Sequence, residues 1–210
     1  YKDELDSMVD FLCSSIGSLT NPKKISDTLK SIKGKSISDM TAKNYLLHLC
    51  DAFLFDYAKR YDVKGKKFFE TPLKFYAADV GLRNARLNFR QVEENHIMEN
   101  VIFNELKIRG YAVDVGVVDI RETIDGKRHA KQLEIDFIAN KGNKKYYIQS
   151  AYEMPTAEKL EQEKRSLIKT NDFFKKIVIV KDNIRPQTDE NGIVTIGLIN
   201  FLLDENSLDL

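Results

Sequence analysis

Apolar residues recur at helical spacing in three successive stretches of the first half of the chain. The stretches cover residues 5–16, 22–33 and 39–53, and their apolar positions fall three or four residues apart, as on one face of a helix. Asn21 and Ser38 precede the second and third stretches, and both residue types favour helix N-caps because their side chains accept backbone N–H groups. The pattern predicts three consecutive helices.

A β-hairpin is predicted after the third helix. Residues 55–58 and 68–76 are rich in aromatic residues and flank a turn at residues 63–66, where Gly65 suits a tight hairpin. Three helices and a hairpin match a winged helix-turn-helix, whose third helix can enter the major groove while the hairpin lies on the phosphates. The candidate nucleic-acid-binding residues are polar residues of the third helix and basic residues of the hairpin, namely Lys43, Asn44, Lys59, Arg60, Lys64, Lys66 and Lys67. The alternative is a solvated turn on a module that packs against a neighbouring domain.

The second half of the chain alternates β-rich runs with helices. We expect helices over residues 91–109, 156–169 and 198–203, and strands over residues 111–118, 133–139, 146–152, 176–180 and 192–196. The polar run 119–131 is expected to be a loop. The different patterns of the two halves predict an α+β protein with two domains, at residues 1–88 and 89–210.

Charge and composition narrow the classes of protein. The 210 residues are 42% hydrophobic and 31% charged, which is enough apolar content for packed cores. The 33 basic and 32 acidic residues exclude a globally basic surface, but 15 basic and 11 acidic residues precede position 89, whereas 18 and 21 follow it. The longest apolar runs fall far short of the ~20 residues of a membrane-spanning helix, so no membrane partner is expected. Cys13 and Cys50 lie in apolar helical patterns without metal-site spacing, as expected for reduced core thiols of a cytoplasmic protein.

Three polar residues occupy positions where chemistry is expected. Glu99 falls in the apolar stripe of the predicted helix 91–109, where a carboxylate is costly unless it is paired or bound to a cation. Asp136 and Gln149 fall on the second and third strands predicted after that helix. The element order and these positions resemble a restriction-endonuclease-like core. This resemblance implies catalytic roles for Glu99, Asp136 and Gln149, with Mg²⁺ or Mn²⁺ held by Glu99 and Asp136.

The resemblance to an active nuclease is incomplete on the third strand. Gln149 offers a neutral oxygen where such enzymes carry a carboxylate, and Ala151 stands where they carry Lys. Lys145, Lys159 or Lys164 could supply the missing cation, although the Lys and Glu spacing of the helix that holds the last two is also that of a solvated face.

Several strings together resemble a known family. They are Lys74–Asn84 (KFYAADVGLRN), Met98–Leu106 (MENVIFNEL) and Glu134–Ile138 (EIDFI). In this order they are similar to the C-terminal region of bacterial and archaeal AAA-type ATPases, a domain of unknown function. The resemblance implies an upstream P-loop ATPase domain, then a winged helix and a restriction-endonuclease-like domain. In that family Gln is common at the position of Gln149, and Glu163 matches a frequent position of unknown role.

ATP binding is not expected within these 210 residues. No G-x-x-x-x-G-K-[ST] loop occurs in the sequence, so ATP would belong to an upstream ATPase domain of the same chain. The chain begins with Tyr1 rather than Met, and we expect it to be part of a longer protein.

Three functions are consistent with these patterns. The first is a nucleic-acid or partner-binding module, made of the winged helix and a degenerate nuclease-like domain, with DNA as a candidate partner. The second is a Mg²⁺-dependent DNA nuclease that uses Glu99, Asp136 and Gln149. The third is a structural regulator that packs on the ATPase domain. The neutral Gln149 and the missing Lys favour the first function over the second.

Overall fold

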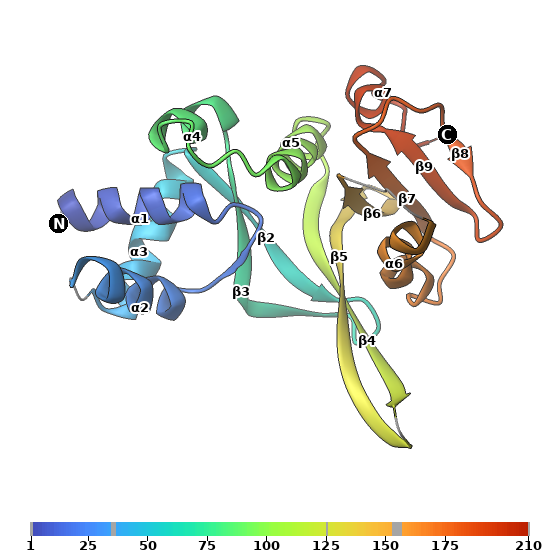
Figure 1. The fold of residues 1–210 in the computed structure, drawn as a ribbon, viewed down its shortest axis with the longest axis horizontal. Helices are drawn as coiled ribbons and strands as arrows, with labels where there is room; N and C mark the ends of the chain where they lie inside the picture. The colour runs from blue at the N-terminus through green and yellow to red at the C-terminus, as the bar shows by residue number, and fades with distance from the viewer. Residues whose placement is uncertain (1, 35–36, 125, 153–156, 210) are drawn as a thin grey trace. The chain divides into compact units, whose positions relative to one another are not determined.

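The computed structural model describes residues 2–34, 37–124, 126–152 and 157–209 (Figure 1). The chain forms two compact units. The first unit comprises Tyr1–Lys59 and Glu70–Asn104, and the second comprises Arg60–Phe69 and Glu105–Leu210. Both units combine helices with strands, so the α+β class predicted from the sequence is confirmed. The domain boundary at residue 88 stays a prediction.

The first unit contains three helices, a β-hairpin and two further helices. Its elements are α1 (Lys2–Ser14), β1 (Leu19–Thr20), α2 (Pro22–Lys33), α3 (Asp39–Asp51), β2 (Phe55–Asp62), β3 (Lys67–Ala77), α4 (Val80–Arg86) and α5 (Glu94–Ile108). The end of β2, the start of β3 and the last turn of α5 belong to the second unit. The three predicted helices are confirmed, and Asn21 and Ser38 cap α2 and α3 by accepting the N–H groups of Lys24 and Thr41.

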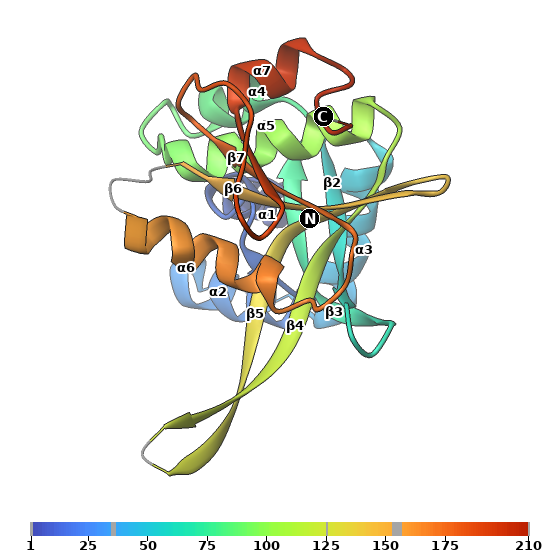
Figure 2. The ribbon, with the colours of Figure 1, turned by 90° about the vertical axis from the view of Figure 1, so that its right-hand side faces the viewer.

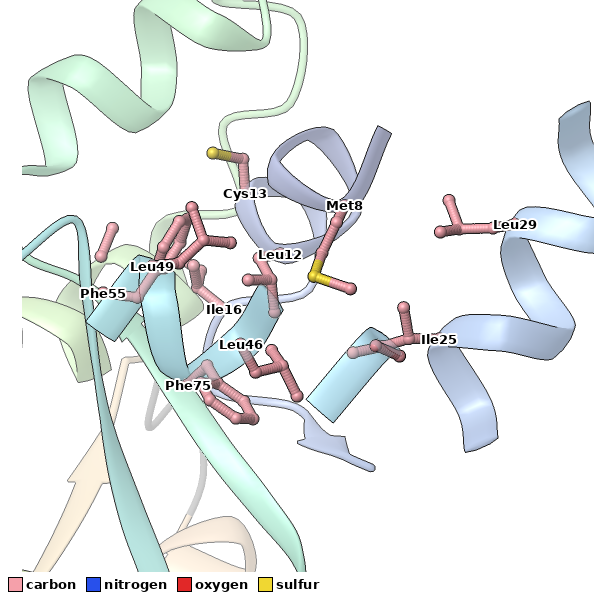
Figure 3. Close-up of a cluster of buried hydrophobic side chains, with 12 residues drawn as sticks. Met8, Leu12, Cys13, Ile16, Ile25, Leu29, Leu46, Leu49, Phe55 and Phe75 are labelled. Atoms are coloured by element: carbon pink, nitrogen blue, oxygen red, sulfur yellow. The ribbon is translucent and has the colours of Figure 1, made fainter. Parts of the chain in front are cut away.

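The core of the first unit joins the three helices to the hairpin. The apolar stripes of α1, α2 and α3 meet side chains from β2 and β3 (Figure 3). Burying each large apolar side chain stabilises the fold by about 1.5–3 kcal/mol relative to leaving it in water. The principal buried residues are Met8, Leu12, Ile16, Ile25, Leu29, Leu46, Leu49, Phe55 and Phe75. This packing fixes α3 against the hairpin and so positions the polar residues on their outer surfaces.

The second unit is a mixed sheet with two helices of its own. Its elements are β4 (Ala112–Ile124), β5 (Lys127–Lys141), β6 (Lys144–Ala151), α6 (Ala157–Ile168), β7 (Lys175–Val180), β8 (Gln187–Thr188), β9 (Ile193–Gly197) and α7 (Leu198–Leu203). β4, β5 and β6 are antiparallel neighbours, β7 is parallel to β6 and β9, and β8 is antiparallel to β9. The end of β2 joins this sheet, where Arg60 pairs with Val115 in parallel. None of the described helices is both long and apolar enough to cross a lipid bilayer.

The hairpin of β4 and β5 is much longer than the sequence predicts. The expected loop at residues 119–131 is wrong, because Asp119–Ile124 pair antiparallel with Lys127–Gln132. Figure 2 shows this hairpin extending beyond the other strands of the second unit. Most of its outer part is exposed on both faces, so its sequence lacks the apolar alternation that marks a half-buried strand.

Candidate functional site

Glu99 lies in a buried polar cluster of the first unit. Its side chain is 12% exposed, and its Oε1 accepts hydrogen bonds from Lys74 Nζ at 3.0 Å and from Tyr76 Oη at 2.8 Å. Both donors come from β3, which packs against the face of α5 that carries the carboxylate. A buried charge is tolerated when it is paired and hydrogen-bonded. The pairing therefore explains how α5 can carry Glu in its apolar stripe.

Gly17 allows the main chain to approach this carboxylate closely. A Cβ at residue 17 would lie 3.2 Å from Glu99 Oε1, and the backbone there has a φ of +70°, in the left-handed region. The N–H of Gly17 donates to the carbonyl of Phe75 at 2.9 Å, which fixes the segment after α1 beside β3. Only Gly meets both the steric and the conformational demand without strain.

The string Lys74–Asn84 makes main-chain contacts that hold the first unit together. Asn100 on α5 accepts the N–H of Ala77 at 2.8 Å and donates to the carbonyl of Ala77 at 2.8 Å. Arg83 on α4 is 1% exposed and donates from Nε to the carbonyl of Cys13 at 2.7 Å. Helix α4 lies just before residue 88, in a segment for which the sequence pattern predicts no helix. These contacts connect β3, α4 and α5 to the end of α1.

Asp136 and Gln149 lie together in the second unit, on the neighbouring strands β5 and β6. The N–H of Asp136 donates to Gln149 Oε1 at 3.4 Å, and the N–H of Ser150 donates to Asp136 Oδ2 at 2.8 Å. Gln149 Nε2 in turn donates to Glu163 Oε2 of α6 at 3.3 Å. A chain of polar contacts thus runs from β5 through β6 to α6.

Each oxygen donor of the Mg²⁺ or Mn²⁺ site that the sequence predicts has a hydrogen-bond partner within its own unit. Glu99 belongs to the first unit and is engaged by Lys74 and Tyr76. Asp136 Oδ2 and Gln149 Oε1 accept main-chain N–H groups of the second unit. Within the described ranges, no group of three or more His, Cys, Asp or Glu side chains is placed to hold a metal. The catalytic and metal-binding roles of Glu99, Asp136 and Gln149 stay predictions.

The three lysines that the sequence offers as replacement cations differ in their contacts and burial. Lys164 is 5% exposed at its side chain, and its Nζ lies 2.7 Å from Asp189 Oδ2. Burial acts to raise the pKa of Asp189, but hydrogen bonds from Lys164 and from backbone N–H groups outweigh it, so the pKa lies below its ordinary value. Lys145 Nζ lies 4.8 Å from the centre of the Phe174 ring, in a cation–π contact. Lys159 is half-buried on α6.

Three of the predicted nucleic-acid-binding residues belong to the first unit. Lys43 and Asn44 are exposed on α3, and Lys59 is exposed on β2. Lys43 and Lys59 both line a groove of about 390 Å³, together with Glu70 and several apolar side chains. The fold therefore brings together two of these cations, which are distant in sequence.

The other four predicted residues lie in the second unit, within residues 60–67, which we call the β2–β3 turn. Arg60 is on β2, Lys64 and Lys66 lie between the strands, and Lys67 begins β3. Asp62 shapes this turn, because its Oδ1 accepts the N–H groups of Lys64 at 3.1 Å and Gly65 at 2.8 Å. The guanidinium of Arg60 lies 5.1 Å from the centre of the Phe69 ring. Asp62, the acidic residue of the turn, is therefore directed to the main chain and not to these cations. The exposed cations of the turn are Lys64, Lys66 and Lys67.

Two groups of polar residues escape prediction from the sequence. Lys74 is the buried partner of Glu99. Its place beside the aromatic pair Phe75-Tyr76 indicates burial at the end of the strand but does not identify the partner. The second group is a set of exposed basic residues on the outer part of the β4–β5 hairpin, in the run expected to be a loop. Its members are Arg121, Lys127, Arg128 and Lys131.

Comparisons with known proteins give a domain of unknown function and an uncharacterized relative. Residues 1–93 match the family model described as domain of unknown function (DUF8612). An uncharacterized protein of Haemophilus influenzae is 37% identical over 199 residues, which cover 95% of this chain and 46% of that protein. The crystal structure of protein VC1899 from Vibrio cholerae matches 98% of this chain and 55% of its own, with 14% identity and a TM-score of 0.33. None of these descriptions mentions an ATPase.

Proposed function

We propose that this chain is a nucleic-acid-binding module, in which a winged helix (residues 1–88) is joined to a degenerate restriction-endonuclease-like domain (residues 89–210). The β2–β3 turn carries this proposal. Four basic residues fall between positions 60 and 67, where the only acidic residue is Asp62. Asp62 is buried and bonded to the main chain of the turn, so the charge that the turn presents to solvent is positive. Such a cluster attracts phosphates, and displaced counterions make its binding salt-dependent.

Helix α3 supports the same function from the first unit. In a winged helix the third helix supplies contacts to bases and the hairpin supplies contacts to phosphates. Lys43 and Asn44 are exposed on α3, and Lys59 lines the same groove as Lys43. Lys suits phosphate or guanine, and Asn can pair with the edge of adenine.

Binding to a short fluorescein-labelled DNA duplex of mixed sequence tests the proposal. Fluorescence anisotropy at several salt concentrations gives the affinity and its salt dependence. We expect Lys64→Ala/Lys66→Ala/Lys67→Ala to weaken binding and to reduce the slope of log K against log salt by about three, if each lysine contacts one phosphate.

A matched control removes the same charge from exposed positions outside the turn. The control is Lys2→Ala/Lys30→Ala/Lys169→Ala, and we expect its salt slope to equal that of the wild type. Failure of the wild type to bind the duplex at low salt would contradict the proposal. Equal losses in the two triple variants would show that net charge, and not the turn, governs binding.

A Mg²⁺-dependent nuclease is the second candidate, and the position of Glu163 favours it. The carboxylate of Glu163 accepts a hydrogen bond from Gln149, and the main-chain N–H of Asp136 donates to the same side chain, so Gln149 links these two acidic residues of the second unit. If the chain is only a binding module, we expect no cleavage when duplex DNA is incubated with the protein and Mg²⁺ or Mn²⁺. Metal-dependent cleavage that is lost in Asp136→Asn would establish the nuclease instead.

The resemblance to AAA-type ATPases supports one more part of the proposal, namely that the module serves an ATPase domain of the same chain. The Haemophilus influenzae relative is a suitable test protein, because this chain spans 46% of its length. We expect the full-length relative to hydrolyse ATP faster in the presence of duplex DNA. Hydrolysis that depends on the matched region but not on DNA would favour the structural regulator, and absence of hydrolysis would remove the ATPase from the proposal.

A further inference from the structure

The hairpin of β4 and β5 ends in a projecting ribbon made of strand residues 119–124 and 127–132, which we call the arm. In the described part of the chain, the arm strands pair only with each other, whereas the inner part of β4 also pairs with β2 and the inner part of β5 with β6. Six residues per strand at about 3.4 Å each make the arm roughly 20 Å long. Figure 2 shows it extending away from the sheet and from α6.

The arm and the β2–β3 turn together differ in charge from the rest of the second unit. Residues 60–69 and 119–132 contain eight basic and four acidic residues, and the remainder of the unit contains 13 basic and 15 acidic residues. Three of the four acidic side chains are engaged: Asp62 by the main chain of the turn, Asp119 by the side-chain amide of Gln132, and Glu122 by an ion pair with Arg165 of α6. Positive charge is thus concentrated on the two segments that extend from this unit.

Hydrogen bonds join the turn to the base of the arm. Arg60 Nη2 donates to Gln132 Oε1 at 3.1 Å, and Lys64 Nζ donates to the carbonyl of Asp119 at 3.1 Å. Asp119 and Gln132 are cross-strand partners, and their side chains bond at 3.0 Å. The cations of the turn therefore continue directly into the arm.

The two faces of the arm carry different residues. Side chains alternate along a strand, and cross-strand partners share a face. Arg121 and Arg128 consequently share the face of Gln132, on which Arg60 is bonded. Lys127 and Lys131 lie on the opposite face.

That opposite face also carries Ile120 and Glu122. Ile120 is buried in the core cluster of the unit, which includes Leu167 of α6, and Glu122 is ion-paired with Arg165 of α6. The face of Arg121 and Arg128 is therefore the one directed away from α6.

We infer that the arm lies along a groove of double-stranded DNA with Arg121 and Arg128 toward the duplex, an inference that rests on the proposed nucleic-acid-binding function. The major groove of B-DNA is about 12 Å wide and admits a two-stranded ribbon, and an arm of roughly 20 Å is long enough to follow it. Single-stranded nucleic acid is usually held by aromatic stacking. The arm contains no Phe, Tyr or Trp, which favours a duplex as the ligand.

The two faces supply a matched pair of variants. Arg121→Ala/Arg128→Ala and Lys127→Ala/Lys131→Ala each remove two positive charges from the same exposed arm. The test is fluorescence anisotropy with a labelled duplex and with a labelled single strand of the same length, which gives the affinity of each variant over a range of salt concentrations. The arginine variant is expected to bind the duplex roughly tenfold more weakly, with a salt slope lower by about two, and the lysine variant to stay within about threefold of the wild type.

The outcomes separate this inference from the function on which it rests. If the arginine variant binds like the wild type, the arm is not the contact, and if the two variants lose affinity equally, the face assigned to the duplex is wrong. In either case the turn remains a contact, provided that the lysine triple variant of the turn is still defective. A preference for the single strand also overturns the inference. If the wild type binds neither nucleic acid, both the function and the inference fail. Arg121→Gln/Arg128→Gln repeats the test with longer polar side chains, and circular dichroism confirms the fold of each variant.

Discussion

Replacing Glu99 by Ala tests whether this buried carboxylate is structural. The substitution removes the acceptor of the hydrogen bonds from Lys74 Nζ at 3.0 Å and Tyr76 Oη at 2.8 Å. The side chain of Lys74 is only 5% exposed, so water cannot readily take the place of the lost carboxylate. Removing one partner of a buried ion pair costs about 3–5 kcal/mol. We expect the free energy of unfolding to fall by that amount, a large share of the roughly 5–15 kcal/mol of a typical domain.

A double-mutant cycle separates the ion pair from the packing around it. Lys74→Met and Glu99→Leu replace the two charged side chains by apolar ones of similar size. Exchanging a whole buried pair for apolar residues is often close to neutral, whereas each single substitution leaves a charge behind. We expect the double variant to lose at least about 2 kcal/mol less than the sum of the single variants. Urea-induced unfolding followed by circular dichroism gives all four free energies.

This reasoning would be refuted if Glu99→Ala lowered the free energy of unfolding only slightly, or if the losses of the two single variants simply added in the double variant. If Glu99→Ala costs less than about 1 kcal/mol, the carboxylate is not needed by the fold and is open to another role. A metal-binding Glu99 has a further signature, because a ligand of the folded state raises its stability in proportion to RT ln(1 + [L]/Kd). We expect the wild type to melt at the same temperature in Mg²⁺ and in EDTA. A Mg²⁺-dependent increase that Glu99→Ala abolishes would assign the residue to a metal.

Three other substitutions or titrations test separate parts of the fold. Gly17→Ala is expected to lower the free energy of unfolding by roughly 1–2 kcal/mol in urea, because φ is +70° and the new Cβ would lie 3.2 Å from Glu99. Burial, with smaller effects from Asp56 and Asp51, raises the pKa of Cys50 to about 11, so its reaction with a thiol reagent at pH 8 should be much slower in the native protein than in urea. The lowered pKa of Asp189 contributes stability that is complete above its unfolded pKa, roughly 3.9, and is lost as the pH falls through the lower folded value. Urea-induced unfolding at a series of acidic pH values measures this dependence, and we expect Lys164→Met to reduce it. An unchanged dependence of the free energy of unfolding on pH would contradict the ion pair of Lys164 with Asp189.

The helices of the first unit are predictable because local signals agree there. Asn21 and Ser38 cap the helices that they precede in the sequence, and Met8 and Leu12 of the predicted stripe are buried. The arm is not predictable by the same means. Its order comes from cross-strand main-chain pairing, and past Ile120 the described side chains of the arm are not buried, so apolar periodicity carries no information.

The candidate site is only partly predictable. Asp136 and Gln149 are near each other because they sit on consecutive strands that pair as antiparallel neighbours. The contact of Glu163 with Gln149 depends on how α6 packs against β6, and the contact of Lys74 with Glu99 spans 25 residues and depends on how β3 packs against α5. No local pattern encodes such packing, so Lys74 could be identified as a partner only from the fold.

The residues of Lys74–Asn84 make structural contacts, so similarity in this string indicates a shared packing arrangement before it indicates a shared activity. Lys74 and Tyr76 bond to Glu99, Asn100 bonds to the main chain of this string, and Arg83 bonds to the main chain of α1. These groups are occupied in maintaining the first unit, so a protein that shares the string shares first of all this packing. Activity can differ among such proteins, because it depends on exposed residues outside the string. Under the proposed function those residues are the cations of the β2–β3 turn and of the arm, and we expect substitutions there to alter binding while leaving the stability of the first unit unchanged.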